Sequence, residues 1–505
     1  MYNWEEFITL VEDSTTKKEL YSLFFADESV RQHEIFNLPD DVVLAIPENS
    51  CLRKDSTQVI YYGNSRFDVW CCRLLPQQVV CLSLFDGIRT LYEVAEVFKF
   101  LSGCNHTAAD LKVRYFLRTI DALETEKLVN LSKNPTARIQ TINAKDFLIK
   151  NSKLCYRLDA PTSLIIMPTD KCLTDCEYCY ACRRTIHEKN LLSVKRILEL
   201  VDEAHEIGVI GINVDGGDIF ARKEYQEILE RMLAYKIEPS ISTKGYVSKE
   251  KSKELARIGL RWLQVGLDST REMCDKLVRR RGYFDRIVET IYNLNDVGVR
   301  VRTNSIITRE SLHLLPELVD FLMTLPLTDI KVAPAFLGLF RGNESMLLTT
   351  LQKQWFRRIM EEKEKQYPDH KINWECEEDI LDAPVEQIAE RFSSRPYCSS
   401  GRTQIVITPD GKVVTCEQSP QEGEFVCGDV TYQSIMEVWN SEALKKWYEP
   451  SKELFIGTVC YDCDVFTDCV CAMGHCWLQV LKIRGRLYDA HPYCPKGKKP
   501  KQHWN

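Results

Sequence analysis

From about residue 160 to residue 340 the chain alternates between short apolar runs and amphipathic stretches of helical period, and this alternation constrains the fold more than any other feature. Helical runs such as SVKRILELVDEAHEIG separate six runs of strand length. The six strand-like runs are SLIIMP, VIGINVDG, EPSISTKG, RWLQVGLDS, GVRVRTNSIIT and DIKVAPAF. Repeated strand–helix units predict an α/β fold with a parallel sheet, and six of them suit a partial barrel whose chemistry gathers at the carboxyl ends of the strands.

The bulk properties indicate a soluble protein of several domains. The 505 residues are too many for one hydrophobic core and suggest about three domains. No apolar stretch approaches the ~20 uncharged residues of a membrane helix, and the acidic start MYNWEEFITLVEDSTTKK lacks the features of an export signal. The net charge of −7 argues against a nucleic-acid partner. The basic run Arg279–Arg281 is explained as well by a solvated helix end as by a nucleic-acid-binding surface. We therefore expect a cytoplasmic protein that binds neither membrane nor nucleic acid.

The 21 cysteines are clustered, with three between Cys172 and Cys179 and nine between Cys398 and Cys494. In a reducing cytosol, cysteines at short spacings indicate metal or cluster ligands rather than disulfides. The scattered cysteines are expected to pack as small hydrophobic residues; these are Cys51, Cys71, Cys72, Cys81, Cys104, Cys155, Cys274 and Cys376.

The first cluster, Cys172-x3-Cys176-x2-Cys179, follows directly after the first strand of the alternating region. Three thiolates on one loop can hold three corners of a [4Fe–4S] cube, and the fourth iron then stays open to the amine and carboxylate of a substrate. A closed zinc site with Cys182 as fourth ligand is one alternative, although it lacks the usual two knuckles. A ferredoxin-like electron carrier is another, but it would not need a barrel.

A CxxxCxxC loop with an aromatic residue, Tyr178, before its last cysteine resembles the radical SAM superfamily. The resemblance implies that Cys172, Cys176 and Cys179 form the catalytic centre by ligating a [4Fe–4S] cluster that binds S-adenosylmethionine (SAM). In that family the reduced cluster passes one electron to the sulfonium of SAM. The products are methionine and a 5′-deoxyadenosyl radical, which removes a hydrogen from an unactivated carbon. A barrel suits this chemistry because it excludes water.

Later segments match the same family in order. Gly216-Gly217-Asp218 resembles the Gly-Gly-Glu turn that contacts the methionine amine, with a shorter carboxylate. Ser242-Thr243-Lys244-Gly245 stands where many members carry Thr-Asn-Gly. Gly266-Leu267-Asp268-Ser269 resembles Ser-Leu-Asp with glycine replacing serine, so the ribose contact is expected from Asp268 or Ser269. The position of Arg281 suits pairing with the SAM carboxylate. The resemblance thus implies SAM contacts from Tyr178, Gly216, Gly217, Asp218, Ser242, Asp268, Ser269 and Arg281.

The cysteine-rich tail resembles the SPASM extension of peptide-modifying radical SAM enzymes, which holds two auxiliary [4Fe–4S] clusters. By that resemblance Cys460, Cys463, Cys469 and Cys494 ligate one cluster. The other, nearer the barrel, would be ligated by Cys398, Cys416 and Cys476. The spacing departs from the family after Cys469, so Cys471 stays an alternative to Cys476. Cys427 is a further candidate for the nearer cluster, whose fourth iron would otherwise stay open to a substrate sulfur. A zinc ribbon is the alternative for this tail.

The front of the chain reads as a small α+β unit. VVLAI, QVIYYG and DVWCCRL predict strands, and LYEVAEVFKFL and ADLKVRYFLRTIDALETEKLV predict helices. Asp86-Gly87 predicts a turn, and Thr90 with Glu93 predicts a capping box. LPQQVVCLSLFDGIRTLYEVAEVF resembles the winged-helix leader-recognition domain (RRE) of peptide-maturation enzymes, in which an extended leader adds a strand to a sheet edge. A nucleic-acid-binding winged helix is the alternative.

Together these resemblances predict an enzyme that matures a ribosomally synthesised peptide. The expected segments are an extension of unknown role (1–40), leader recognition (41–140), the radical SAM core (155–345), a helical bridge (346–395) and the SPASM domain (396–505). Expected cofactors are SAM and three [4Fe–4S] clusters, and expected partners are a precursor peptide with its leader and a flavodoxin- or ferredoxin-type reductant.

The expected reaction is a thioether crosslink from a peptide cysteine, as in sactipeptide and ranthipeptide synthases. Carbon–carbon crosslinking of the cyclophane type and epimerisation are the alternatives within this class. A sulfatase-maturing radical SAM enzyme is a further alternative, against which the leader-like front argues. A non-enzymatic iron–sulfur redox or DNA-binding protein is the last.

Overall fold

The computed structural model describes residues 34–46, 50–64, 69–121, 130–132, 134, 142–181, 186–340, 344–376 and 384–497. The chain divides into two compact units, Met1–Asp159 and Ala160–Asn505, and each is described by itself. Most of the expected N-terminal extension and the second half of the helix expected at 109–129 lie outside the described residues. Within the described ranges, no helix is both long and apolar enough to cross a membrane.

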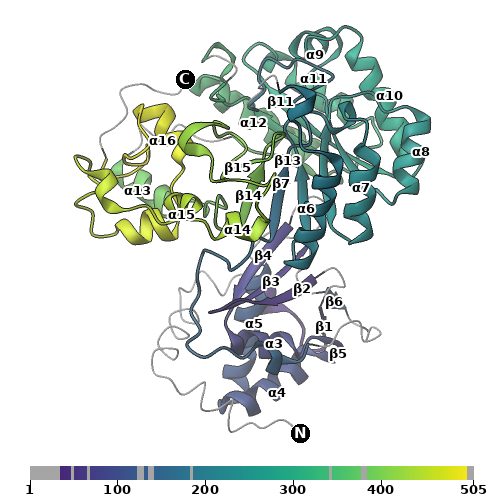
Figure 1. The fold of residues 1–505 in the computed structure, drawn as a ribbon. Coiled ribbons are helices and arrows are strands. Elements are labelled where there is room, and N and C mark those ends of the chain that lie inside the picture. Colours follow the sequence, from purple (N-terminus) through teal and green to yellow (C-terminus); the bar gives the residue numbers. More distant parts are fainter. Residues whose placement is uncertain are drawn as a thin grey trace. The chain divides into compact units, whose positions relative to one another are not determined.

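Within its described residues, the first unit contains two three-stranded sheets and three α-helices (Figure 1). One sheet has the order β5-β1-β6, from Asp86–Thr90, Val43–Ala45 and Asn130–Ser132. The other is antiparallel with the order β2-β3-β4, from Ser50–Lys54, Val59–Asn64 and Val69–Leu74. The helices are α3 (Pro76–Leu82), α4 (Leu91–Ser102) and α5 (His106–Asp121). The predicted strands β1, β3 and β4 and the predicted helices α4 and α5 are present, whereas β2, β5, β6 and α3 were not predicted from the sequence.

The start of helix α4 is set by the predicted capping box. The Glu93 N–H donates to Thr90 Oγ1 at 3.2 Å, and the Thr90 N–H donates to Glu93 Oε2 at 2.9 Å. The turn predicted at Asp86-Gly87 is wrong as an element, because Asp86–Thr90 forms strand β5. Asp86 still accepts from the N–H groups of Ile88 and Arg89, as an aspartate in a turn does.

The core of this unit is an apolar cluster that includes Tyr61, Leu74, Phe85 and Val113, all 1% exposed or less. Arg114 of α5 is also buried, and its guanidinium donates to the Leu38 carbonyl at 2.7 Å and pairs with the Asp40 carboxylate at 2.7 Å. The arginine therefore fastens the segment before β1 to helix α5.

The second unit is built on a ten-stranded sheet with the order β13-β12-β11-β10-β9-β8-β7-β14-β15-β16. Six consecutive strands pair in parallel, as predicted from the alternating pattern. They are β7 (Ser163–Ile166), β8 (Gly211–Val214), β9 (Glu238–Thr243), β10 (Trp262–Gly266), β11 (Arg300–Ile307) and β12 (Asp329–Pro334). The linking helices are α6 (Val194–Glu206), α7 (Tyr225–Ala234), α8 (Lys249–Arg257), α9 (Arg271–Leu277), α10 (Tyr283–Asn295) and α11 (Leu315–Leu322).

Four further strands extend this sheet at both ends. Strand β13 (Ile372–Trp374) pairs in parallel with β12, and it lies in the segment predicted to be a helical bridge. That prediction is correct for α12 (Thr350–Gln366) and α13 (Val385–Ser393) and wrong for the three residues of β13. Strand β14 (Gln404–Ile407) pairs in parallel with β7 and leads to β15 (Lys412–Val414) and β16 (Gly428–Asp429). The cysteine-rich tail is thus part of the same sheet.

Helices α14 (Ile435–Trp439), α15 (Glu442–Tyr448) and α16 (Trp477–Arg484) complete the tail. The Arg196 side chain of α6 donates to the carbonyls of Val430 at 2.7 Å and Gln433 at 3.0 Å. Glu203 of α6 accepts from the Ile435 N–H at 2.8 Å. Helix α6 therefore holds the first helix of the tail as well as packing on the sheet.

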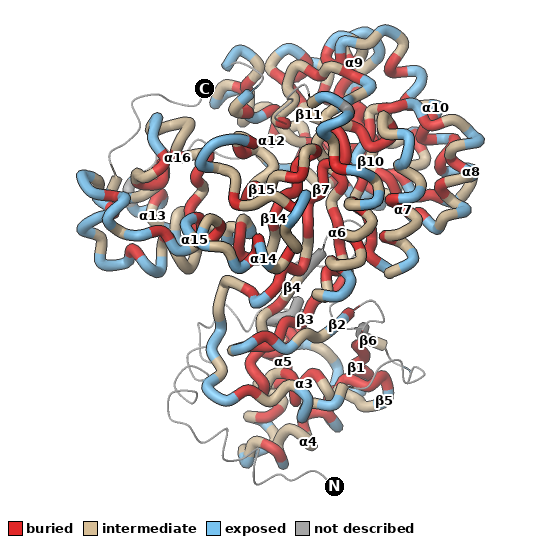
Figure 2. The backbone as a smooth tube through the Cα atoms, in the orientation of Figure 1, coloured by how far each residue is buried: buried red, intermediate tan, exposed pale blue. Residues whose placement is uncertain are grey.

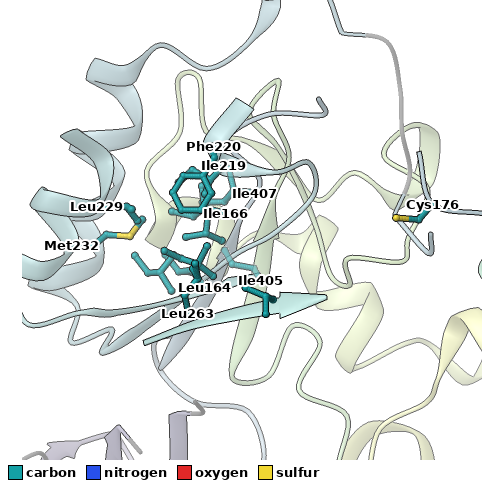
Figure 3. Packing of buried hydrophobic residues seen from close by; sticks show 14 of the residues in the cluster. Leu164, Ile166, Cys176, Ile219, Phe220, Leu229, Met232, Leu263, Ile405 and Ile407 are labelled. Atoms are coloured by element: carbon teal, nitrogen blue, oxygen red, sulfur yellow. The ribbon is translucent and has the colours of Figure 1, made fainter. Parts of the chain in front are cut away.

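Along strands β8 to β12, the sheet of the second unit has one apolar and one polar face. Strand β11 alternates between buried residues such as Val301 and half-buried residues such as Arg302. The apolar side chains meet the helices, as Figure 3 shows for Leu164, Ile166 and Leu229, and the strands are buried over most of their length in Figure 2. Half-buried polar side chains mark the other face; they include Asn213, Ser240, Gln264, Arg302, Asn304 and Lys331. The fold is therefore an open parallel barrel whose inner surface is polar along β8 to β12. At β7, β14 and β15 the same face carries an apolar cluster of Ile165, Met167, Val406 and Val414.

Candidate functional site

The loop that carries Cys172, Cys176 and Cys179 follows β7 at the carboxyl end of the sheet. It is fastened to the end of helix α9, because the Asp175 and Glu177 N–H groups donate to the carbonyls of Val278 and Leu277 at 3.1 Å each. Cys176 is 4% exposed, and the Figure 3 view shows it on the loop, apart from the packed residues of the strands. Cys172 and Cys179 are half-buried.

Two arginines of the basic run hold this loop. Arg279 pairs with the Asp175 carboxylate at 3.2 Å and with the Glu177 carboxylate at 3.3 Å, and Arg280 donates to the Leu173 carbonyl. The run is therefore not only a solvated helix end. Arg281, which the sequence placed near the SAM carboxylate, is exposed at the turn before α10. Its predicted contact with SAM stays a prediction.

The surroundings of Cys176 act on the pKa of its thiol in opposite directions. Burial raises the pKa of its thiol, whereas the nearby Lys244 ammonium and the Thr174 hydroxyl, at 3.5 Å, lower it. Cys179 interacts with Cys176 electrostatically, so the two sulfurs lie near each other. A bound iron ion favours the thiolate strongly, because its positive charge outweighs the cost of burial. Cys182, the candidate fourth zinc ligand, lies outside the described residues.

Gly216 and Gly217 bring the end of β8 against the cysteine loop. Gly216 has a φ of +87°, and a Cβ there would lie 2.8 Å from Met167 Cβ. A Cβ on Gly217 would lie 2.3 Å from the Lys171 carbonyl oxygen, a distance that real Cβ atoms do not reach. The Gly217 N–H donates to the Thr169 carbonyl at 2.8 Å. Both glycines are thus required for the close approach of two backbones.

The side chain of Asp218 connects the ends of β8 and β9. Its Oδ2 accepts from Thr243 Oγ1 at 2.6 Å and from the Lys244 N–H at 3.3 Å, and its Oδ1 accepts from the Phe220 N–H at 3.0 Å. Burial raises the pKa of this carboxyl in spite of these hydrogen bonds. The carboxylate of the Gly-Gly-Asp turn therefore accepts three hydrogen bonds from the protein, and its predicted contact with SAM stays a prediction.

Asp268, at the end of β10, is 0% exposed and accepts from three different elements. Oδ1 accepts from the Ile306 N–H at 2.9 Å, and Oδ2 accepts from the Tyr178 hydroxyl and from Lys244 Nζ at 2.9 Å. Burial and then the Asp268 charge raise the pKa of Tyr178 well above its usual value, so the phenol keeps its proton and donates. Ser269 is buried and its Oγ has no hydrogen-bond partner among the described residues, whereas Ser242 is exposed and accepts from Gln264 Nε2 at 3.2 Å.

Four cysteines of the tail lie together. The Cys460 thiol interacts with those of Cys463, Cys469 and Cys494, and burial followed by these three neighbours raises its pKa to about 12. Four mutually repelling thiolates are the arrangement that bound iron would stabilise. Arg395 Nη2 donates to Cys469 Sγ at 3.3 Å, and Lys496 Nζ lies 3.8 Å from Cys463 Sγ. These cations would offset the negative charge of a cluster on four thiolates.

A second group joins Cys398, Cys416 and Cys476. Burial, together with the smaller effects of the Glu417, Cys398 and Cys476 charges, raises the pKa of Cys416 to about 12. Gly474 allows this approach, because a Cβ there would lie 2.7 Å from Cys398 Cβ. Cys471 interacts instead with Arg402, Glu449 and Cys469. Cys427 is buried, with 2% of its surface exposed, and its thiol faces the Phe425 carbonyl and Trp447.

The structure therefore groups the tail cysteines as the sequence predicts and favours Cys476 over Cys471. Among the residues it describes, no three His, Cys, Asp or Glu side chains converge on a point that would hold a single metal ion. A [4Fe–4S] cube has a different geometry, since each cysteine binds a separate iron at a corner of the cube. The donor sets, all thiols in groups of three and four, fit such clusters, and the individual ligand roles stay a prediction.

Several residues of the site were not singled out from the sequence. Tyr180 lies between the two halves of the second unit, since Asp215, Glu417, Cys179 and Cys416 all raise its pKa, after the larger effect of burial. Its ring stacks on Phe336 with centroids 6.0 Å apart. Burial also raises the pKa of Asp215 and of Glu417, which interact with each other. Adjacency to Cys179, to Gly216 and to Cys416 was the only sequence signal for Tyr180, Asp215 and Glu417.

Family comparisons agree with this geometry. Residues 166–322 match the radical SAM superfamily, and residues 398–464 match the SPASM iron–sulfur cluster-binding domain. The chain therefore carries a radical SAM domain followed by a SPASM domain, and the predicted fold class is confirmed. By their descriptions, these domains imply SAM and iron–sulfur clusters as cofactors.

Particular relatives are more distant. Fe-coproporphyrin III synthase of Methanosarcina barkeri is 29% identical over 155 residues, which cover 30% of this chain and 39% of the relative. The subtilosin biosynthesis protein AlbA of Bacillus subtilis is 25% identical over 290 residues, which cover 57% of this chain and 61% of AlbA. The chain thus spans less than two thirds of the length of these relatives. The SAM-bound crystal structure of Streptococcus suis SuiB has a similar fold, with a TM-score of 0.59 at 16% identity over 90% of this chain and 99% of SuiB.

Proposed function

We propose that this protein is a radical SAM enzyme that modifies a ribosomally synthesised precursor peptide. The observation that carries the proposal is the convergence of a three-cysteine loop, a two-glycine turn and the buried Asp268 at the carboxyl ends of β7, β8 and β10. In parallel α/β sheets this edge is where substrates bind. The tail strands β14 to β16 extend the same sheet. The grouped tail cysteines would supply the auxiliary cluster sites that peptide modification uses.

Each cofactor has a defined set of residues in this proposal. Cys172, Cys176 and Cys179 hold a [4Fe–4S] cluster, which when bound supplies the electron that cleaves SAM. The tail would hold two auxiliary clusters, one on Cys460, Cys463, Cys469 and Cys494 and the other on Cys398, Cys416 and Cys476. The protein itself orients SAM with the backbone of Gly216 and Gly217 and excludes water with the surrounding barrel. A flavodoxin- or ferredoxin-type protein would be the reductant.

The first unit would bind the leader of the precursor. Among the described residues, the sheet β2-β3-β4 has two outer strands, and each pairs only with β3. An extended peptide can add to such an edge through backbone hydrogen bonds, and its alternate side chains then give selectivity. In this proposal residues 41–140 recognise the leader, residues 155–345 form the radical SAM core and residues 396–505 hold the auxiliary clusters.

The favoured product is a thioether between a cysteine sulfur and a carbon of the same peptide. An auxiliary cluster with three protein ligands, such as the Cys398 group, has an iron that a substrate thiolate can occupy. AlbA, whose name assigns it to biosynthesis of the bacteriocin subtilosin, is the relative that supports a bacteriocin-like peptide substrate. Carbon–carbon crosslinking is the second candidate. If the cluster of the Cys398 group had four protein ligands, no iron would be open to a substrate thiolate, and the cluster would serve only to accept an electron.

The test is anaerobic incubation of the full chain with SAM, a reductant and the peptide encoded beside its gene, followed by high-resolution mass spectrometry. Loss of two hydrogens with thiols that no longer alkylate supports a thioether, whereas the same loss with free thiols supports a carbon–carbon bond. Unchanged mass with 5′-deoxyadenosine produced points to epimerisation, which deuterated solvent would reveal. Intact SAM with reduced, reconstituted protein would refute the proposal. A peptide without its leader should be modified poorly, and the variant C172A/C176A/C179A is the negative control.

A further inference from the structure

Lys244 crosses from the end of β9 to the end of β10 through space that only a glycine leaves open. Its Nζ pairs with Asp268 Oδ2 at 2.9 Å. A Cβ on Gly266 would lie 1.9 Å from Lys244 Nζ and 2.8 Å from its Cε. Gly266 is not among the residues with positive φ, so the backbone does not require glycine there. The position of the Lys244 side chain does, and the two residues form a matched pair.

The carboxylate that Lys244 reaches is a junction between four parts of the site. Asp268 is fully buried just after the end of β10, and besides Lys244 it accepts from the Ile306 N–H of β11 and from the Tyr178 hydroxyl of the cysteine loop. A buried carboxylate without a counter-ion is costly, because it loses its hydration without compensation. Lys244 is the cation that pairs with Asp268 in the structure. Its Nζ also lies 5.5 Å from the centroid of the Tyr178 ring, which adds a cation–π attraction.

Tyr178 is the residue through which this junction reaches the iron site, since Cys179 follows it directly. If Asp268 lost its cation, the carboxylate would turn away from its place between the strands, and the Tyr178 hydroxyl would lose its acceptor. The segment of the loop that ends in Cys179 would then be held by fewer contacts. The expected ribose contact of Asp268 is also affected, because both of its oxygens already have protein donors.

We propose that Lys244 is a positioning residue for SAM binding, which acts across Gly266 on Asp268 and through the Tyr178 hydroxyl on the cysteine loop. This inference deepens the proposed function and rests on it only in taking SAM as the ligand. It assigns Asp268 a role in holding the loop rather than in contacting ribose. If the ion pair were purely structural, its loss would affect folding, but variants with the wild-type iron content would keep the wild-type affinity for SAM. This difference defines the test.

The experiment measures the dissociation constant for SAM by equilibrium dialysis of the reconstituted full chain, together with the change that SAM causes in the EPR spectrum of the reduced cluster. Each variant is first compared with the wild type in iron content and far-UV circular dichroism. We expect K244M and Y178F each to weaken SAM binding at least tenfold and to reduce the EPR change. The double variant K244M/Y178F should lose little more than either single variant, because the two residues act through one carboxylate.

The matched pair is tested separately. G266S should weaken SAM binding at least tenfold, because its Cβ displaces the Lys244 side chain from Asp268, and K244M/G266S should lose little more than either single variant, because both changes remove the same ion pair. The control is K251M, which removes a nearby lysine that lies 4.3 Å from the Phe220 ring centroid and has no contact with Asp268 among those of the described residues. It should keep the wild-type affinity.

Wild-type affinity in Y178F, K244M or G266S, or a loss in K244M/G266S equal to the sum of the two single losses, would overturn the inference. The Y178F variant removes a single hydroxyl group, so it keeps the inference open to refutation even if a charge change at residue 244 prevents folding. Failure of the wild-type protein to bind SAM would instead refute the proposed function.

Discussion

Ile405 of β14 lies in parallel register beside Leu164 of β7, although 241 positions separate them in the chain. Both side chains are 0% exposed and belong to the cluster that fills the space between sheet and helices, where Figure 3 labels them. Through this pairing the first strand of the SPASM region continues the radical SAM sheet. The auxiliary cysteine groups are consequently fixed to the barrel by a strand rather than by a flexible linker.

The pairing predicts a stability cost for the variant Ile405→Ala. Truncating a fully buried isoleucine costs about 2–5 kcal/mol, because apolar contacts are lost and a cavity remains. Thermal unfolding followed by calorimetry should show a lower Tm for the second unit. The exposed Tyr432, at 77% exposure, is the control, and Tyr432→Ala should change stability by less than about 0.5 kcal/mol. Equal Tm values for the two variants would contradict the role of β14.

The choice between Cys476 and Cys471 can be tested by iron content. Cys476 lies with Cys398 and Cys416, whereas Cys471 interacts with Arg402 and Glu449. Cys476→Ala should therefore lose about one cluster's worth of iron after reconstitution, because a [4Fe–4S] cluster takes each thiolate as a ligand. Cys471→Ala should keep wild-type iron. Iron and acid-labile sulfide analysis measures both, and the reverse pattern would assign Cys471 as the ligand.

The turn after β8 predicts a clash in Gly217→Ala. The added Cβ would lie 2.3 Å from the Lys171 carbonyl oxygen, so the cysteine loop must shift. Overpacking of this kind costs about 1–3 kcal/mol, and we also expect weaker SAM binding by equilibrium dialysis. Gly259→Ala is the comparison, since residue 259 has a φ of +95° but nothing within 4 Å of a Cβ. That variant should be destabilised by backbone strain alone and should bind SAM normally.

Asp215 predicts a pH-dependent contribution to stability. Burial raises the pKa of its carboxyl from the ordinary 3.8 to about 6. The folded state then binds the proton more tightly than the unfolded state, so this contribution to stability is lost as the pH rises from about 4 through 6. Asp215→Asn does not ionise and should raise Tm relative to the wild type more at pH 8 than at pH 5. The exposed Asp369→Asn should show no such trend, and a larger gain for Asp215→Asn at pH 5 would refute the assignment.

The capping box of α4 predicts local destabilisation in Thr90→Ala. The Thr90 side chain accepts from the Glu93 N–H, and removing such a cap costs about 1 kcal/mol. Hydrogen exchange with mass spectrometry should show faster exchange in the first turns of α4. Thr107→Ala changes an exposed threonine on α5 and should leave α4 unaffected. Unchanged exchange in Thr90→Ala would mean that tertiary contacts, not the cap, hold this helix end.

Local patterns were sufficient for the parts of the fold that depend on neighbours in sequence. The alternation of strands and helices predicted six parallel strands, because such units can bury their apolar faces only by stacking side by side. The Thr90–Glu93 spacing predicted a cap for the same reason, since both partners lie within one helical turn. The resemblance of the tail to the SPASM extension implied two groups of cysteines, and the structure brings the same residues together, while their roles as ligands stay a prediction.

Only the tertiary structure decided which distant segments meet. Strands β13 and β14 are three and four residues long and carry little periodicity, so their places beside β12 and β7 depend on packing. The arginines at 279 and 280 were an unassigned basic run until the chain brought them to the cysteine loop. Lys244 was one residue of a turn motif. Its partner Asp268 follows the end of the next strand, across a glycine whose missing side chain leaves the space for the ion pair. Sequence spacing determines which residues can share an element, whereas contacts between elements depend on the volume and charge that only the folded chain brings together.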